Sequence, residues 1–183
     1  MNKKIKLFLV LTFPIFILFL LFLIAYSSDK EIDKNNKTHI FVTYQSACID
    51  RCASAWFIKK FIDPKAQFKF IPLNTTIKEG IPFDVPGAKY SSYRGSTTFG
   101  TLVNLYANND LALKEIAKIT NSSENWWSPK EILEAPGVDA IIKGLNLICA
   151  NDNETVEKSM IIFDALYAYE KDKIKFEKTE RND

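Results

Sequence analysis

The sequence predicts an α+β domain in which an N-terminal strand–helix–strand unit is followed by a long irregular loop and a cluster of four to five helices. Two observations predict this class. Short runs of β-branched and aromatic residues flank a helical pattern early in the domain. The second half of the chain carries apolar residues at helical spacing between capping signals.

The strand–helix–strand unit comes first. His39–Tyr44 has the composition of a strand, and Ala66–Leu73 alternates apolar and polar residues as a strand does. Between them, Cys52–Ile62 places its apolar residues along one side of a helix. Pro64 ends this helix, because the residue before a proline avoids the helical region. The three elements together predict a βαβ-like unit.

The chain then runs through a long irregular connection, Leu73–Gly100, which includes the stretch IPFDVPG. Such loops in compact domains are often functional. The helices predicted after it are Thr98–Ala107, Leu111–Thr120, a short helix opened by the capping box Ser128–Glu131, Val138–Ala150 and Glu154 to about Lys171. The stretch APG (Ala135–Gly137) is expected to break the chain between the short helix and the helix Val138–Ala150.

The chain divides into four segments: a transmembrane anchor or uncleaved signal (1–26), a polar linker (27–37), the domain (38–176) and a charged tail (177–183). Leu7–Tyr26 contains no charge, and twenty helical residues rise about 30 Å, the thickness of the hydrocarbon core. Basic Lys3, Lys4 and Lys6 should stay in the cytoplasm, which places the domain on the extracytoplasmic (periplasmic) side of the cell membrane. If Ala25–Ser27 is a signal-peptidase site, the domain is instead secreted to the periplasm.

The net charge excludes one class of partner. The 183 residues hold 24 Lys and Arg against 22 Asp and Glu. Without the three lysines of the basic start, the exported part has 21 basic residues (24 minus 3) and 22 acidic ones. A near-neutral domain outside the cytoplasm lacks the basic surface that nucleic acid requires, so nucleic-acid binding is not expected.

Two of the three cysteines, Cys48 and Cys52, lie one helical turn apart, and the third is Cys149. A structural zinc site needs four ligands, and the sequence adds only one histidine, His39. The spacing is one residue longer than the Cys-x-x-Cys of thioredoxin-like sites. Two interpretations stay open: structural thiols, or a reversible Cys48–Cys52 disulfide. No metal, cofactor or phosphate loop is predicted.

The arginines carry more information, because the chain has 21 lysines and only three arginines, Arg51, Arg94 and Arg181. A lysine-rich sequence uses arginine where a planar fork must hold a carboxylate or an oxyanion. One interpretation is a small anion pocket floored by Arg51 and Arg94. The other is that both arginines pair with Asp50 and Asp84, and so fasten the loop to the helix.

Four stretches resemble the C-terminal domain of chromate-resistance protein B (ChrB). They are DRCASAWFIKKFIDPKAQFKFIP (Asp50–Pro72), IPFDVPGAKYSSYRGSTTF (Ile81–Phe99), EAPGVDAIIKGL (Glu134–Leu145) and FDALYAYEK (Phe163–Lys171). The resemblance implies a bacterial protein linked to chromate resistance. The regulatory members resemble this chain only in their C-terminal half, so their regulatory role is not expected here.

The chain departs from the family pattern at the positions one would expect to bind a metal. Tyr93 stands where the family usually has histidine, Thr97 where it has cysteine, and Asn121–Ser123 where it has an acidic element. The resemblance therefore does not imply metal-dependent activity in this member.

The leading prediction is an exported, non-catalytic domain that binds a small oxyanion such as chromate, or an envelope protein. Because no catalytic set emerges, enzymatic activity is left open and not favoured. The predicted ligand-binding residues are Asp50, Arg51, Trp56, Asp84, Tyr93 and Arg94. One alternative is a thiol-dependent oxidoreductase that acts on chromate through Cys48 and Cys52. Another is a structural envelope protein with a vestigial site.

Overall fold

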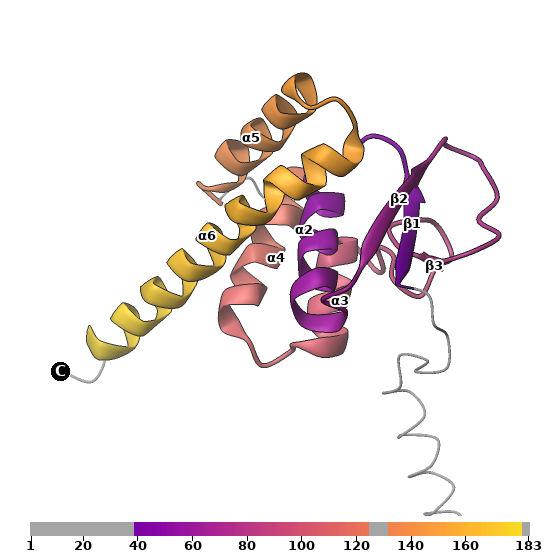
Figure 1. The fold of residues 1–183 in the computed structure, drawn as a ribbon. Helices are drawn as coiled ribbons and strands as arrows, with labels where there is room; N and C mark the ends of the chain where they lie inside the picture. The colour runs from indigo at the N-terminus through magenta and orange to yellow at the C-terminus, as the bar shows by residue number, and fades with distance from the viewer. Residues whose placement is uncertain (1–38, 125–131, 181–183) are drawn as a thin grey trace, which may run out of the picture. The chain divides into compact units, whose positions relative to one another are not determined.

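The computed structural model describes residues 39–124 and 132–180 (Figure 1). The chain divides into two compact units between Lys37 and Thr38, and all the described residues belong to the second unit. Within the described part, no helix is long and apolar enough to cross a membrane. The predicted membrane segment Leu7–Tyr26 and the short helix expected after Ser128 lie outside the described residues.

The sheet has three parallel strands in the order β2-β1-β3: β1 (Ile40–Tyr44), β2 (Gln67–Ile71) and β3 (Ile81–Pro82). Phe41 of the central strand pairs with Phe68 on one side and Ile81 on the other. The α+β class and the strand–helix–strand unit are therefore confirmed. Strand β3 lies inside the connection that was predicted to be irregular. The sequence did not predict this strand, because two residues are too few to form a recognisable strand pattern.

Helix α2 (Ile49–Phe57) follows β1 and continues through a π-helical turn, η1 (Ile58–Ile62). It begins three residues earlier than predicted, with Cys48 as an N-cap that makes no side-chain capping bond. Every residue of α2 except Arg51 is buried, because α3, α4, α5 and α6 all pack against it (Figure 1). Arg51 is therefore the one residue of the central helix that is not fully buried.

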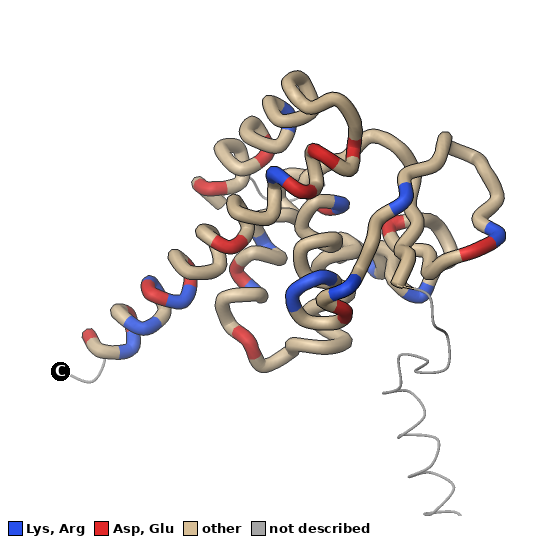
Figure 2. The backbone as a smooth tube through the Cα atoms, viewed as in Figure 1, with Lys and Arg blue, Asp and Glu red and all other residues tan. Residues whose placement is uncertain are grey.

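The remaining helices are α3 (Thr98–Tyr106), α4 (Leu111–Glu124), α5 (Ala135–Ile148) and α6 (Asp152–Glu180). The predicted break at APG is wrong, because a proline at position N1 or N2 is tolerated in the first turn and here begins α5. The predicted end of the last helix near Lys171 is also wrong. No glycine or proline follows Lys171, and the lysines and glutamates of the predicted tail continue the helix to Glu180 (Figure 2).

Trp56 lies in the core of the domain and not at a ligand site. Its ring packs against those of Phe61, Phe99, Phe163 and Tyr167, with centroids 5.6 to 6.3 Å apart. Its indole Nε1 donates to Asp164 of α6 across 3.0 Å. Only 2% of Trp56 is exposed. Trp56 therefore joins α2 to α6 within the core.

Candidate functional site

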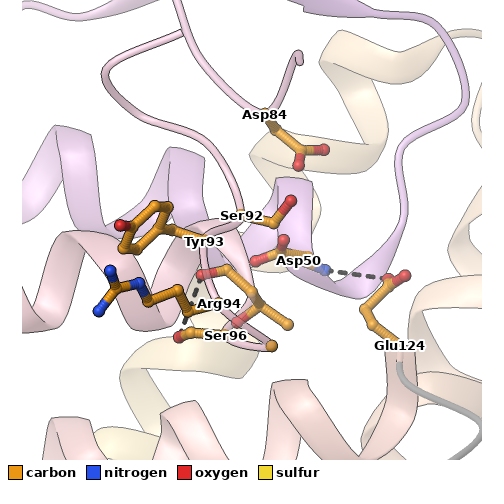
Figure 3. A pocket seen from close by; sticks show the side chains of 9 residues that line it. Asp50, Asp84, Ser92, Tyr93, Arg94, Ser96 and Glu124 are labelled. Atoms are coloured by element: carbon orange, nitrogen blue, oxygen red, sulfur yellow. Dashed lines mark hydrogen bonds between the residues drawn. The ribbon is translucent and has the colours of Figure 1, made fainter. Parts of the chain in front are cut away.

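A pocket of about 320 Å³ opens near the carboxyl ends of the parallel strands (Figure 3). It is lined by Asp50, Asp84, Ser92, Tyr93, Arg94, Gly95, Ser96, Thr97 and Glu124. Asp84 follows β3 by two residues, and Asp50 lies in the first turn of the helix that follows β1. Ligands of parallel sheets bind at this edge of the strands. The structure brings together four of the six predicted ligand residues: Asp50, Asp84, Tyr93 and Arg94.

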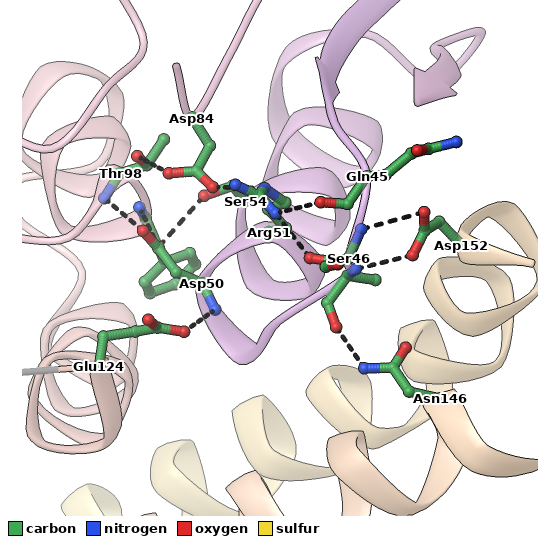
Figure 4. Close-up of polar contacts among 12 residues, drawn as sticks. Gln45, Ser46, Asp50, Arg51, Ser54, Asp84, Thr98, Glu124, Asn146 and Asp152 are labelled. Carbon is green, nitrogen blue, oxygen red and sulfur yellow. Dashed lines mark hydrogen bonds and ion pairs between the residues drawn. The ribbon is translucent and has the colours of Figure 1, made fainter. Parts of the chain in front are cut away.

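Arg51 does not line this pocket, because protein groups already surround its guanidinium (Figure 4). Its Nε lies 2.8 Å from Oδ2 of Asp84, and its Nη1 donates to the carbonyls of Gln45 and Ser46 across 2.9 and 2.6 Å. These partners tie the first turn of α2 to the end of β1 and to the loop after β3. For Arg51, the geometry favours the fastening interpretation over an open anion site.

The loop between β1 and α2 is held by two residues that were not predicted from the sequence. Asp152 accepts hydrogen bonds from the amides of Ser46 and Ala47, and Asn146 donates to the carbonyl of Ala47 (Figure 4). Ser46 has a positive φ of 76°, an uncommon conformation for a residue with a side chain. No local pattern signals these contacts, because Asp152 lies 105 residues after Ala47.

Asp50 is a buried carboxylate that anchors the start of α3. Its two oxygens accept hydrogen bonds from the amides of Thr98 and Phe99, each across 2.8 Å, and only 5% of the residue is exposed. Burial raises the pKa of Asp50 most, followed by the negative charge of Asp84, and the result is a pKa of about 7. The hydrogen bonds from the amides of Thr98 and Phe99 act in the opposite direction and lower this pKa. Asp50 can therefore change its protonation state near neutral pH.

Asp84 and Glu124 add two more carboxylates to the pocket. Asp84 has a positive φ of 49° and accepts a hydrogen bond from the Thr98 hydroxyl across 2.7 Å. Burial raises the pKa of Asp84 above its ordinary value, against the lowering effects of Thr98 and Arg51. Glu124, at the end of α4, accepts from the amide of Asp50 across 3.4 Å. No motif or spacing in the sequence singled out Glu124.

Arg94 sits at the tip of a tight turn. The amides and carbonyls of Tyr93 and Ser96 bond to each other across 3.0 and 3.1 Å. Arg94 and Gly95 both have positive φ, 48° and 80°, as the central residues of a type I′ turn require. The guanidinium carbon lies 5.1 Å from the centroid of the Tyr93 ring, and Figure 3 shows the two side chains together, across the pocket from Glu124. Within the described ranges, Arg94 has no ion pair.

The cysteines form no disulfide among the described residues. Burial raises the pKa of the Cys52 thiol to about 12, and it also raises the pKa of Cys48. The negative charges of Glu124 and Asp84 also raise the pKa of Cys48 and that of Asp152 the pKa of Cys52, whereas the charge of Arg51 lowers the pKa of both thiols. A thiol with a raised pKa is a poor nucleophile at neutral pH, which counts against the oxidoreductase alternative.

The described residues contain no group of three or more His, Cys, Asp or Glu side chains arranged to hold a metal ion. His39 directly precedes β1, and its Nδ1 is 2.6 Å from Oδ2 of Asp63. It is therefore at the opposite end of the strand from the pocket.

The family model that describes the C-terminal domain of ChrB matches residues 41–170. The chain belongs to the ChrB C-terminal domain family. Protein ChrB of Cupriavidus metallidurans is 25% identical over 131 residues, which cover 70% of this chain and 40% of that protein. The chain thus corresponds to less than half the length of this relative. No solved structure is significantly similar.

Proposed function

We propose that this ChrB-type domain acts in chromate resistance by binding, without catalysis, and that its pocket takes a small oxyanion such as chromate. The observation that carries the proposal is the state of Arg94. Its guanidinium lines the pocket, and no carboxylate among the described residues pairs with it. A planar guanidinium offers two parallel donors to the oxygens of an oxyanion.

The strained turn supports the same assignment. A non-glycine residue at positive φ is uncommon, and such conformations gather at functional sites where the surrounding structure maintains them. Arg94 and Asp84 both adopt this conformation, and both line the pocket. The Tyr93 ring holds the guanidinium by a cation–π contact, which keeps it oriented before a ligand arrives.

The carboxylates determine when an anion can enter. Asp50, Asp84 and Glu124 would repel it when ionised, but the pKa values of Asp50 and Asp84 are raised. Once protonated, a carboxylic acid donates a hydrogen bond to an anion instead of repelling it. Oxyanion binding should therefore be coupled to proton uptake and should strengthen as the pH falls through about 7.

Titration calorimetry of the full chain in detergent tests the proposal, with chromate and with sulfate. Sulfate takes up no proton near neutral pH, so any pH dependence of its binding belongs to the protein. We expect Arg94→Lys to weaken binding by about tenfold, because an ammonium cannot reproduce the bidentate fork. Lys89→Ala is the matched control, since Lys89 is an exposed cation of the same loop outside the pocket lining. If the wild-type chain binds neither anion at millimolar concentration, the proposal fails.

We further propose that the domain faces the periplasm from a single membrane-spanning segment. The uncharged run Leu7–Tyr26 and the lysines before it support this placement. Alkaline phosphatase is active only outside the cytoplasm, so a fusion to the C-terminus should be active in cells. An inactive but full-length fusion would contradict the placement.

A further inference from the structure

The pocket at the carboxyl ends of the strands has a cation on one side and a carboxylate on the other. Arg94 and Glu124 lie across the pocket from each other (Figure 3). The carboxylates of Asp50 and Asp84 line it as well. A bound oxyanion would therefore meet hydrogen-bond donors on the side of Arg94 and acceptors on the side of the carboxylates. The state of these acceptors decides which oxyanions fit.

Two of the three carboxylates have both oxygens engaged by groups of the protein. The oxygens of Asp50 accept hydrogen bonds from the amides of Thr98 and Phe99. One oxygen of Asp84 accepts from the Thr98 hydroxyl, and the other lies 2.8 Å from Nε of Arg51. Each of these four oxygens therefore already has a donor within the fold.

Glu124 differs, because only one of its oxygens has a donor in the part of the chain that the structure describes. Its Oε1 accepts from the amide of Asp50 across 3.4 Å, whereas Oε2 has neither a hydrogen bond nor an ion pair among the described residues. The negative charge of Glu124 raises the pKa values of Asp50, Asp84 and Cys48, so the carboxylate lies close enough to act on all three. Because the side chain is exposed, solvent or a ligand can reach Oε2.

We propose that Glu124 makes the pocket selective for oxyanions that still carry a proton, such as hydrogenphosphate and hydrogen chromate, over fully ionised ones such as sulfate. This inference rests on the oxyanion binding proposed above. The O–H of the anion donates to Oε2 of Glu124, because an ionised carboxylate accepts hydrogen bonds and cannot donate them. The other oxygens of the anion accept from Arg94 and from the hydroxyl of Ser92, which also lines the pocket. No covalent bond forms or breaks.

A fully ionised oxyanion brings only acceptors to this side of the pocket. It sets a charged oxygen against that of Glu124, and Oε2 loses water without gaining another donor. Sites built to hydrogen-bond a ligand hydroxyl reject analogues that lack it by up to about 10⁴–10⁵-fold. Glu124 is exposed, so solvent and salt screen part of this effect. We therefore expect a preference of at least about tenfold.

Titration calorimetry of the full chain in detergent tests the preference with inorganic phosphate and sulfate. At about pH 8 both anions are tetrahedral and mainly doubly charged, and they differ in the one proton that phosphate keeps. Phosphate should bind at least about tenfold more tightly. Equal affinities would overturn the selection and leave oxyanion binding intact, and so would a chain that binds chromate but no phosphate. A chain that binds none of the three anions would refute the proposed function itself, and this inference with it.

Glu124→Gln tests the residue. Glutamine keeps an oxygen that can accept from the amide of Asp50, and its NH₂ group offers a donor in place of the acceptor Oε2. The ratio of the sulfate affinity to the phosphate affinity should increase by about tenfold. Loss of the negative charge alone would strengthen the binding of both anions alike, because they carry the same charge. An unchanged ratio therefore contradicts selection by Glu124.

Glu79→Gln is the matched control. It makes the same change at an exposed position outside the pocket lining, so both affinities should stay as they are in the wild-type chain. If Glu79→Gln changes the ratio as much as Glu124→Gln does, the selectivity does not arise at Glu124 and the proposal is wrong.

Discussion

Replacing Asp50 by alanine tests how the first turn of α2 and the start of α3 hold each other. Asp50 accepts the amides of Thr98 and Phe99, each across 2.8 Å, in a place where only 5% of the residue is exposed. Alanine would leave two buried donors without an acceptor. Each unsatisfied buried donor costs about 1–3 kcal/mol, so the loss amounts to about 2–6 kcal/mol.

Two effects reduce this loss. The substitution also removes the repulsion between Asp50 and Asp84 and the cost of burying a charge. We therefore expect the free energy of unfolding to fall by about 2–4 kcal/mol, a large fraction of the roughly 5–15 kcal/mol of a typical domain. Asp50→Asn keeps one acceptor oxygen and should cost about half as much.

Urea denaturation of the full chain in detergent, followed by the fluorescence of its tryptophans, measures both variants. Asp139→Ala is the control, because Asp139 forms an exposed pair with Lys143 on α5 and such pairs contribute little. If Asp50→Ala unfolds at the same urea concentration as Asp139→Ala, the anchoring role of Asp50 is refuted.

Two further predictions follow from the pKa values. The folded state raises the pKa of Asp50 from 3.8 to about 7, so it binds this proton more tightly than the unfolded state does. The free energy of unfolding should therefore increase by at most about 4 kcal/mol as the pH falls from about 7 towards 4. In urea titrations at different pH values, Asp50→Asn should remove most of this increase. A wild-type chain that loses stability over this pH range would contradict the raised pKa of Asp50. Because burial raises the pKa values of Cys48 and Cys52, iodoacetamide at neutral pH should label both thiols slowly in the native chain and rapidly in urea, as mass spectrometry can follow. Rapid native labelling of either thiol, or a rate of chromate loss that falls with Cys48→Ser, would instead favour the oxidoreductase alternative.

The local predictions succeeded where one periodicity or one signal decided the structure. The parallel β1–β2 pair and the helix between them follow from alternation, helical spacing and Pro64. Errors arose where a local signal has two meanings. Pro136 predicts a break in the chain, but in the first turn of α5 a proline is compatible with the helix. The charges near the C-terminus predict a tail, yet lysine and glutamate at helical spacing extend α6 to Glu180.

The site shows the same division. The scarcity of arginine singled out Arg51 and Arg94, but both were open to two interpretations. Their surroundings separate them: Arg51 is enclosed by Asp84 and two backbone carbonyls, whereas Arg94 stands at the tip of a turn. Glu124 escaped notice because it enters the pocket from the end of α4, 74 residues after Asp50.

The sequence by itself determined the α+β class, the βαβ unit, the family motifs and the residues scarce enough to mark a site, because composition and periodicity are properties of short stretches. Only the tertiary structure decided which carboxylates meet which arginine and how deeply each is buried. Both the pairing and the burial depend on contacts between residues that are distant in the sequence. Asp50 and Thr98, for example, lie 48 residues apart and come into contact only when α2 and α3 pack together. Burial and proximity then shift the pKa of Asp50, which no short stretch of sequence encodes.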